Sequence, residues 1–195
     1  MNPKPLFARV AATVIRSALA YVALSVMAPP SSALSTKQAP GTQKPASGTS
    51  SQGQVDGFSG LLLTTPDADW QKAWATPSGT TPVIKTTSRV HVGEKLFVVI
   101  LFGNPSLKDN TADVTCDIDV LRPDGTASVH ETALPCYKDP IEGSPEQFFA
   151  ARPGVAFIGE STDMPGTWVV RVVLHDNNRN VTLPLVTTFV LAKGS

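Results

Sequence analysis

The chain carries no surplus of either charge. Its 195 residues include 16 Lys and Arg against 16 Asp and Glu, and charged residues make up only 16% of the total. Proteins that bind nucleic acid concentrate positive charge on one face, and this sequence has neither a basic field nor an acidic tail. We therefore expect no nucleic acid partner.

Cysteine is almost absent. The two cysteines are Cys116 and Cys136. An even pair in a chain bound for an oxidising compartment is typical of a disulfide. We expect the two to be bridged, which would stabilise the domain by roughly 3 kcal/mol by closing a loop of about twenty residues. The alternative is a pair of free buried thiols.

Catalytic and metal-binding motifs are also missing. The sequence contains no Gly-x-Ser-x-Gly elbow and no His-Glu-x-x-His helix. Its three histidines, His91, His130 and His175, lie in or beside different predicted strands. We expect no catalytic residue, no metal ligand and no cofactor, and we expect the protein not to be an enzyme.

Acidic side chains cluster in two kinds of place. Asp113, Asp117 and Asp119 form a row that is typical of a solvated strand face rather than of a general acid and base. Residues 109–110 and 176–178 are oxygen-rich loops that suit ordinary turns, with calcium binding as the alternative.

The N-terminus has the pattern of a secretion signal. Positive charges precede an apolar run over 17–28, which is too short to span a bilayer, and the small residues Ser31 and Ala33 follow it. We predict a signal peptide over 1–33, cleaved after Ala33, and a periplasmic or secreted protein. The alternative is an inner-membrane anchor over 10–28, which would place Arg16 inside the membrane.

A polar segment separates this leader from the domain. Residues 34–57 are rich in Ser, Thr, Gln, Gly, Pro and Ala, and they contain almost nothing apolar. Such a composition cannot bury enough surface to offset the entropy of ordering, so it predicts a disordered linker. The folded domain is then 58–195, which is long enough for a single β-sandwich.

The domain shows short apolar or alternating runs separated by Pro, Gly, Asp and Asn. Repeated short strands at this spacing predict an all-β fold, a single antiparallel sandwich. The predicted strands are 60–64, 83–86, 95–102, 112–121, 126–132, 147–150, 168–175 and 181–191.

Three of these runs have distinctive patterns. Residues 113–120 alternate, with Cys116 on the apolar face, and the turn at 123–125 returns the chain so that a bulge would bring Cys136 to Cys116. Residues 96–102 are apolar throughout, which predicts a strand covered on both faces. Pro184 cannot donate a ladder hydrogen bond, so its strand should lie at an edge or be bulged there.

Trp70 and Trp74 are the strongest candidates for ligand contact. A spacing of four residues would place both rings on one face of a helical turn. An aromatic pair of this kind can hold a glycan ring or the apolar tip of a partner. The alternative is a plug over one end of the sandwich, which we prefer.

One segment carries a fold-level resemblance. Residues 163–168 (DMPGTW) resemble the corner that opens the penultimate strand of immunoglobulin-like and fibronectin-like sandwiches, with Gly166 and Trp168 matching and tryptophan replacing the usual tyrosine. The turn at 122–125 is similar to a hairpin of bacterial exported members of that superfamily. The resemblance implies an immunoglobulin-like fold and no particular activity.

We therefore expect an exported, non-enzymatic binding module whose partner is another envelope protein. The alternatives are a carbohydrate-binding module that uses Trp70 and Trp74, and an accessory subunit of an envelope enzyme or transport assembly.

Overall fold

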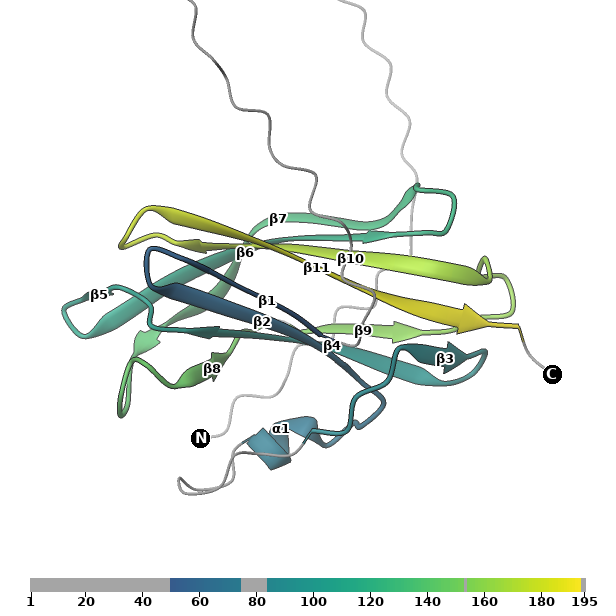
Figure 1. The fold of residues 1–195 in the computed structure, drawn as a ribbon, viewed down its shortest axis with the longest axis horizontal. Helices are drawn as coiled ribbons and strands as arrows, with labels where there is room; N and C mark the ends of the chain where they lie inside the picture. Colours follow the sequence, from purple (N-terminus) through teal and green to yellow (C-terminus); the bar gives the residue numbers. More distant parts are fainter. Residues whose placement is uncertain (1–49, 75–83, 153, 194–195) are drawn as a thin grey trace, which may run out of the picture. The chain divides into compact units, whose positions relative to one another are not determined.

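The computed structural model describes residues 50–74, 84–152 and 154–193, and nearly all of their regular structure is β-strand (Figure 1). The strands form two sheets that pack face to face, which confirms the predicted all-β sandwich. The predicted signal peptide 1–33 and residues 34–49 of the predicted linker lie outside the described residues.

Sheet A has five strands. Strands β1, β2 and β4 lie side by side in that order. Strands β8 and β9 both pair with the far edge of β4, at different places along it. The five strands are β1 (Ser50–Val55), β2 (Phe58–Thr65), β4 (Lys95–Gly103), β8 (Phe148–Ala150) and β9 (Val155–Ile158).

Sheet B has six strands. It runs in the order β3-β11-β10-β6-β5, and β7 also pairs with β6. The six strands are β3 (Arg89–His91), β5 (Leu107–Lys108), β6 (Thr111–Leu121), β7 (Ala127–Pro140), β10 (Gly166–Asp176) and β11 (Val181–Ala192).

The core lies between the two sheets and follows from the period of two. Along β6 every second residue is buried, and β10 and β11 repeat the pattern. At one end of the core, Trp168 stacks with Phe189 and both contact Phe157. The indole Nε1 of Trp168 donates a hydrogen bond to the carbonyl of Met164 at 3.0 Å, so this large ring is buried without an unsatisfied donor.

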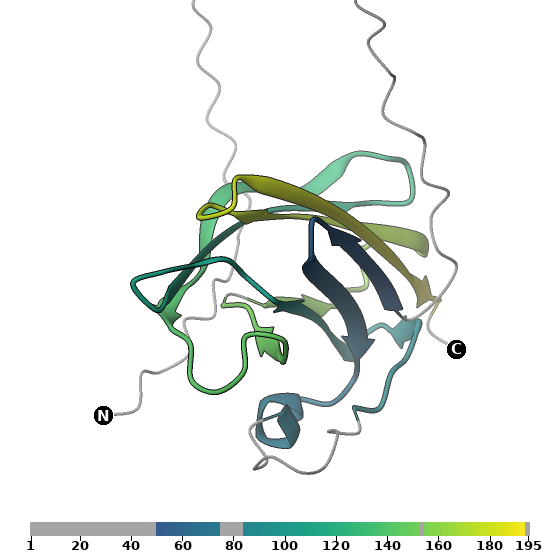
Figure 2. The ribbon, with the colours of Figure 1, turned by 60° about the vertical axis from the view of Figure 1, so that its left-hand side comes forward.

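Strand β4 is buried on both faces, as its sequence predicts. Its inward residues join the main core, whereas Val99 and Leu101 point to the opposite side of sheet A. The helix α1 (Trp70–Trp74) covers that side, and Figure 2 shows it on the face of sheet A that is turned away from β10 and β11. The helix therefore supplies the second apolar environment that β4 requires.

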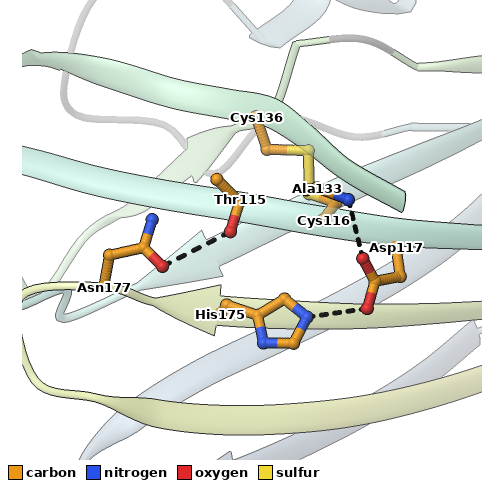
Figure 3. The surroundings of a disulfide bond; sticks show 7 residues. All are labelled: Thr115, Cys116, Asp117, Ala133, Cys136, His175 and Asn177. Atoms are coloured by element: carbon orange, nitrogen blue, oxygen red, sulfur yellow. Dashed lines mark hydrogen bonds and ion pairs between the residues drawn. A yellow bond between two sulfur atoms is a disulfide. The ribbon is translucent and has the colours of Figure 1, made fainter. Parts of the chain in front are cut away.

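Strand β7 is an edge strand with an irregular ladder. Its register against β6 shifts at three places, and Ala133 has a positive φ of 54°. These irregularities let Cys136 reach Cys116, with 5.8 Å between the two Cα atoms (Figure 3). The predicted disulfide is confirmed, and Cys116 points inward as its alternation indicates.

Two buried or half-buried charges hold one end of the sandwich together. The buried carboxylate of Asp176 accepts a hydrogen bond from the backbone N–H of Ser106 at 2.7 Å, and it pairs with Arg179 at 3.6 Å. The guanidinium of Arg179 in turn donates to the carbonyls of Asp56 and Asn104. The β10–β11 hairpin of sheet B is thereby tied to the ends of β1 and β4 in sheet A.

The structure corrects the predicted N-terminal boundary. Residues 50–57, assigned above to the linker, form β1 and the turn to β2, because the β1 backbone pairs along β2 and needs few apolar side chains of its own. The described part of the sandwich thus begins at Ser50, not at residue 58.

Several strand predictions also need correction. Residues 84–87 form no strand, and this part of the chain pairs with β11 only further along, at β3. That pairing is parallel, so sheet B is mixed rather than wholly antiparallel. Because β3 reaches only Val190–Ala192 of β11, the segment around Pro184 lies at a sheet edge, as predicted.

Replacing Cys116 and Cys136 together with serine should lower the free energy of unfolding by about 3 kcal/mol, because the disulfide closes a 20-residue separation in the unfolded chain. Urea denaturation of the oxidised protein and of the double variant measures the difference. A reducing agent should destabilise the native protein by a similar amount and leave the variant unchanged. Equal stability of all three samples would contradict the prediction.

Candidate functional site

The acidic row predicted from the sequence lies on the outer face of sheet B, together with polar side chains from neighbouring strands. The three aspartates of the predicted row, Asp113, Asp117 and Asp119, alternate with buried residues of β6 and therefore share this face. Each of them has partners on neighbouring strands. Each carboxylate of the row is therefore held by its own partners.

Asp117 lies between Asp113 and Asp119 along β6. It accepts a hydrogen bond from the backbone N–H of Ala133 at 2.8 Å, and its other oxygen lies 2.9 Å from Nε2 of His175 (Figure 3). The Ala133 N–H and the imidazole stabilise the ionised carboxylate, so they lower the pKa of Asp117. The β7 bulge thus contributes a backbone donor to the face as well as positioning the disulfide.

The other two aspartates are also paired. Asp119 lies 2.6 Å from Nδ1 of His130, and this contact raises the pKa of the histidine. Asp113 accepts from Asn177 at 2.8 Å and pairs with Lys138 at 2.9 Å, and the two donors lower the pKa of Asp113. Two of the three scattered histidines therefore belong to the aspartate row, which sequence spacing did not reveal.

A carboxylate, an imidazole and a hydroxyl stand in line on this face. Nδ1 of His175 lies 3.3 Å from Oγ1 of Thr182, while its Nε2 faces Asp117. Such a chain is the arrangement that activates a nucleophile in hydrolases. Here the three groups lie on the outer face of sheet B, and none of them lines the hollow beside Tyr137.

The other half of the same face carries one cation among mostly apolar side chains, with Thr167, Thr182 and Thr188 also pointing outward. Outward positions of β10 and β11 are occupied by Val169, Val173, Pro184, Val186 and Val190. Arg171 lies among them, exposed, opposite Asp119 on β6 and Val186 on β11. Asp119 is already bonded to His130, and within the described part of the chain Arg171 forms no ion pair.

The tryptophan pair does not form an open platform. Trp70 is only 6% exposed and packs against Val99 and Leu101, while Trp74 is half-buried in the same cluster. A glycan needs an accessible ring face, so Trp70 cannot serve the predicted carbohydrate site in this conformation. The packing corresponds to a plug, placed over the outer face of sheet A rather than over an end of the sandwich.

A groove of about 510 Å³ opens between β7 of sheet B and β8 of sheet A. Its lining residues are Tyr137, Asp139, Pro140, Glu142, Phe149 and Arg152. Burial, together with the charge of Asp139, raises the pKa of Tyr137. Sequence reasoning missed this groove, because its two rings come from different sheets and β7 was expected to end at residue 132.

The oxygen-rich loops act as turns. The Asp176 carboxylate is occupied by Ser106 and Arg179, and Asp109 and Asn110 adopt the positive φ values of a tight turn. Within residues 50–74, 84–152 and 154–193, no cluster of three His, Cys, Asp or Glu side chains has the geometry of a metal site. In the same ranges no helix has the length and hydropathy needed to cross a membrane.

Comparisons with known proteins place the chain in no family. No family model matches it, and no curated relative matches it. Among solved structures it is similar to a family 123 glycoside hydrolase from Clostridium perfringens, with 9% identity and a TM-score of 0.36, over 68% of this chain and 28% of the hydrolase. It is also similar to a Niemann-Pick type C2 protein from the Japanese carpenter ant, with 11% identity and a TM-score of 0.34, over 68% of this chain and 89% of that one. Likenesses this distant carry no function to the chain.

Replacing Trp70 with alanine should lower the free energy of unfolding by about 3 kcal/mol, because it leaves a large cavity over β4. Trp74→Ala is the matched control and should cost less, since this ring is only half-buried. Thermal melting of both variants measures the two losses. A Trp70→Ala protein that keeps full stability but loses binding to a glycan panel would restore the carbohydrate interpretation.

The Asp117–His175 pair should make stability depend on pH in the acid range. The pKa of Asp117 lies below 3.8 in the fold, so its contribution is present above that pH and is lost as the pH falls through the folded pKa. Asp117→Asn should therefore lower the free energy of unfolding by about 1 kcal/mol at neutral pH. The loss should be smaller at a pH far below 3.8. Urea denaturation at both pH values measures this, and a difference that does not shrink in acid would contradict it.

Proposed function

We propose that the domain is an exported, non-enzymatic interaction module, and that its partner is another envelope protein bound on the outer face of sheet B. The observation that carries the proposal is Arg171, an exposed cation without an ion pair among the described residues, set beside apolar outward side chains. The aspartates and histidines of β6, β7 and β10 on that face are already paired.

The apolar outward residues support a protein partner. A sheet face that meets only water normally alternates to polar residues, yet Val169, Val173 and Val186 occupy outward positions around Arg171. Protein interfaces combine an apolar centre with a polar rim, and arginine is enriched among the residues that dominate their binding energy. The valines would form the centre, and the aspartate row the rim.

Charge complementarity defines the chemistry of the partner. A partner that covered Arg171 without pairing it would bury an uncompensated charge, which costs several kcal/mol. A carboxylate takes both ends of a guanidinium at once. We therefore propose that the partner presents an acidic side chain to Arg171 and apolar side chains to the valines.

The disulfide lies directly behind the charged half of this face. Cys116 precedes Asp117 on β6, and Cys136 fixes β7 beside it (Figure 3). A cross-linked, hydrogen-bonded surface loses little conformational freedom on binding, which favours affinity. The same disulfide supports export, because such bonds persist in oxidising compartments.

The order of strands supports the immunoglobulin-like superfamily as the origin of the sandwich. In that fold the last strand, the penultimate strand and the third strand lie side by side in one sheet. Here β11, β10 and β6 lie in that order. The Trp168 bond to the carbonyl of Met164 takes the place of the tyrosine hydroxyl bond at the same corner.

Substitution of Arg171 tests the proposed face. The exported protein, immobilised, is used to capture partners from an envelope extract of the cells that make it, alongside Arg171→Glu and the control Lys95→Glu, an exposed cation on β4 of sheet A. Capture should fall about tenfold or more with Arg171→Glu and persist with Lys95→Glu. If both variants captured the partner equally well, the contact would lie elsewhere. If the protein chemically converted a captured molecule, the non-enzymatic role would be contradicted.

A further inference from the structure

We propose that the β7–β8 groove is a binding site for a cationic side chain, a guanidinium or an ammonium group of a basic peptide, which takes the place now held by Arg152. This site lies apart from Arg171 and its valines. It is independent of the function proposed for the outer face of sheet B.

Aromatic rings form the floor of the groove. Tyr137 comes from β7 and Phe149 from β8, and their ring centroids lie 5.9 Å apart. Behind them the fully buried Phe102 contacts both rings, at 5.3 Å and 5.7 Å. The rings are thus held by the core, and their remaining surface offers the negative faces to which cations are attracted.

The structure already holds one cation at this site. The guanidinium carbon of Arg152 lies 6.0 Å from the centroid of Tyr137, and its Nη1 lies 3.4 Å from the carboxylate of Asp139. Both contacts are long, and the side chain of Arg152 is 71% exposed. Arg152 therefore shows that the groove accommodates a guanidinium, and its weak contacts leave it easy to displace.

The charge of the groove favours a cation over an anion. Two carboxylates, Asp139 and Glu142, line it against the single positive charge of Arg152. The carboxylate of Glu142 forms no ion pair with any described residue. Lys138, the neighbouring cation, is bonded to Asp113 on the outer face of sheet B. An incoming cation would be attracted by one or two carboxylates, whereas an anion would be repelled by them.

The backbone around the groove is fixed, so Arg152 can swing aside without moving the chain. The backbone N–H of Arg152 donates to the carbonyl of Cys136 at 2.7 Å. Across the groove the Gln147 amide donates to the carbonyl of Glu142 at 2.8 Å, and the Tyr137 hydroxyl donates to that of Pro140 at 3.3 Å. A preformed site of this kind spends little of the binding free energy on ordering.

Titration with small probes tests the site without knowledge of the partner. The purified exported protein is titrated with N-acetyl-arginine amide, and backbone NMR shifts are followed at Tyr137, Glu142 and Arg152. The neutral control is N-acetyl-citrulline amide, which has nearly the same shape as the arginine probe. The arginine probe should shift these residues, with an affinity that falls as salt is added, and citrulline should not. Equal shifts with both probes, or none with either, would overturn the proposal.

Three variants separate a cation site from its alternatives. Arg152→Ala removes the built-in competitor and should strengthen binding of the arginine probe about threefold to fivefold. Glu142→Gln should weaken it by a similar factor, and Glu146→Gln, a nearby exposed carboxylate outside the groove, should leave it unchanged. Weaker binding in Arg152→Ala would show that Arg152 holds the ligand, as for an anion or a sugar, and would overturn the proposal. Because no partner protein is used, the outcome is separate from that of the Arg171 experiment.

Discussion

The apolar layer between the two sheets determines which side chains reach the surface. It is assembled from alternate residues of β4, β6, β10 and β11, so each strand must also present its remaining residues outward. The aspartates and Arg171 lie on one surface because their neighbours in sequence are buried. On β4 the outward residues Val99 and Leu101 are themselves apolar, and the short helix covers them with Trp70.

Local patterns were sufficient for the parts of the fold that repeat along one strand. The alternation over 113–120 predicts β6 and the inward Cys116, and the continuous apolar run over 96–102 predicts the doubly buried β4. Strands β1, β3 and β9 escaped prediction because they are short, or polar, or defined by a partner distant in sequence. Nothing within three or four residues of β3 indicates a parallel pairing with the last strand.

The sites depend still more on pairing between distant segments. Asp117 and His175 are separated by 58 residues, and they meet only because β6 pairs with β10 in one register. The groove likewise joins Tyr137 and Phe149 from opposite sheets. A single sequence displays the aspartates, histidines and aromatic residues, but it does not display the register. The sequence likewise does not show whether Trp70 points toward β4 or toward solvent, because that depends on which strand the helix packs against.

The outer edge of β7 pairs with no other strand of the described chain. A long, straight outer strand would offer its free N–H and C=O groups to another copy and start a continuous intermolecular sheet. Along β7 the bulge at Ala133 interrupts the ladder, and Pro135 and Pro140 have no N–H to donate. The bulge that brings the two sulfur atoms together thus also hinders the addition of another strand at this edge. One local distortion both permits the disulfide and opposes aggregation through β7.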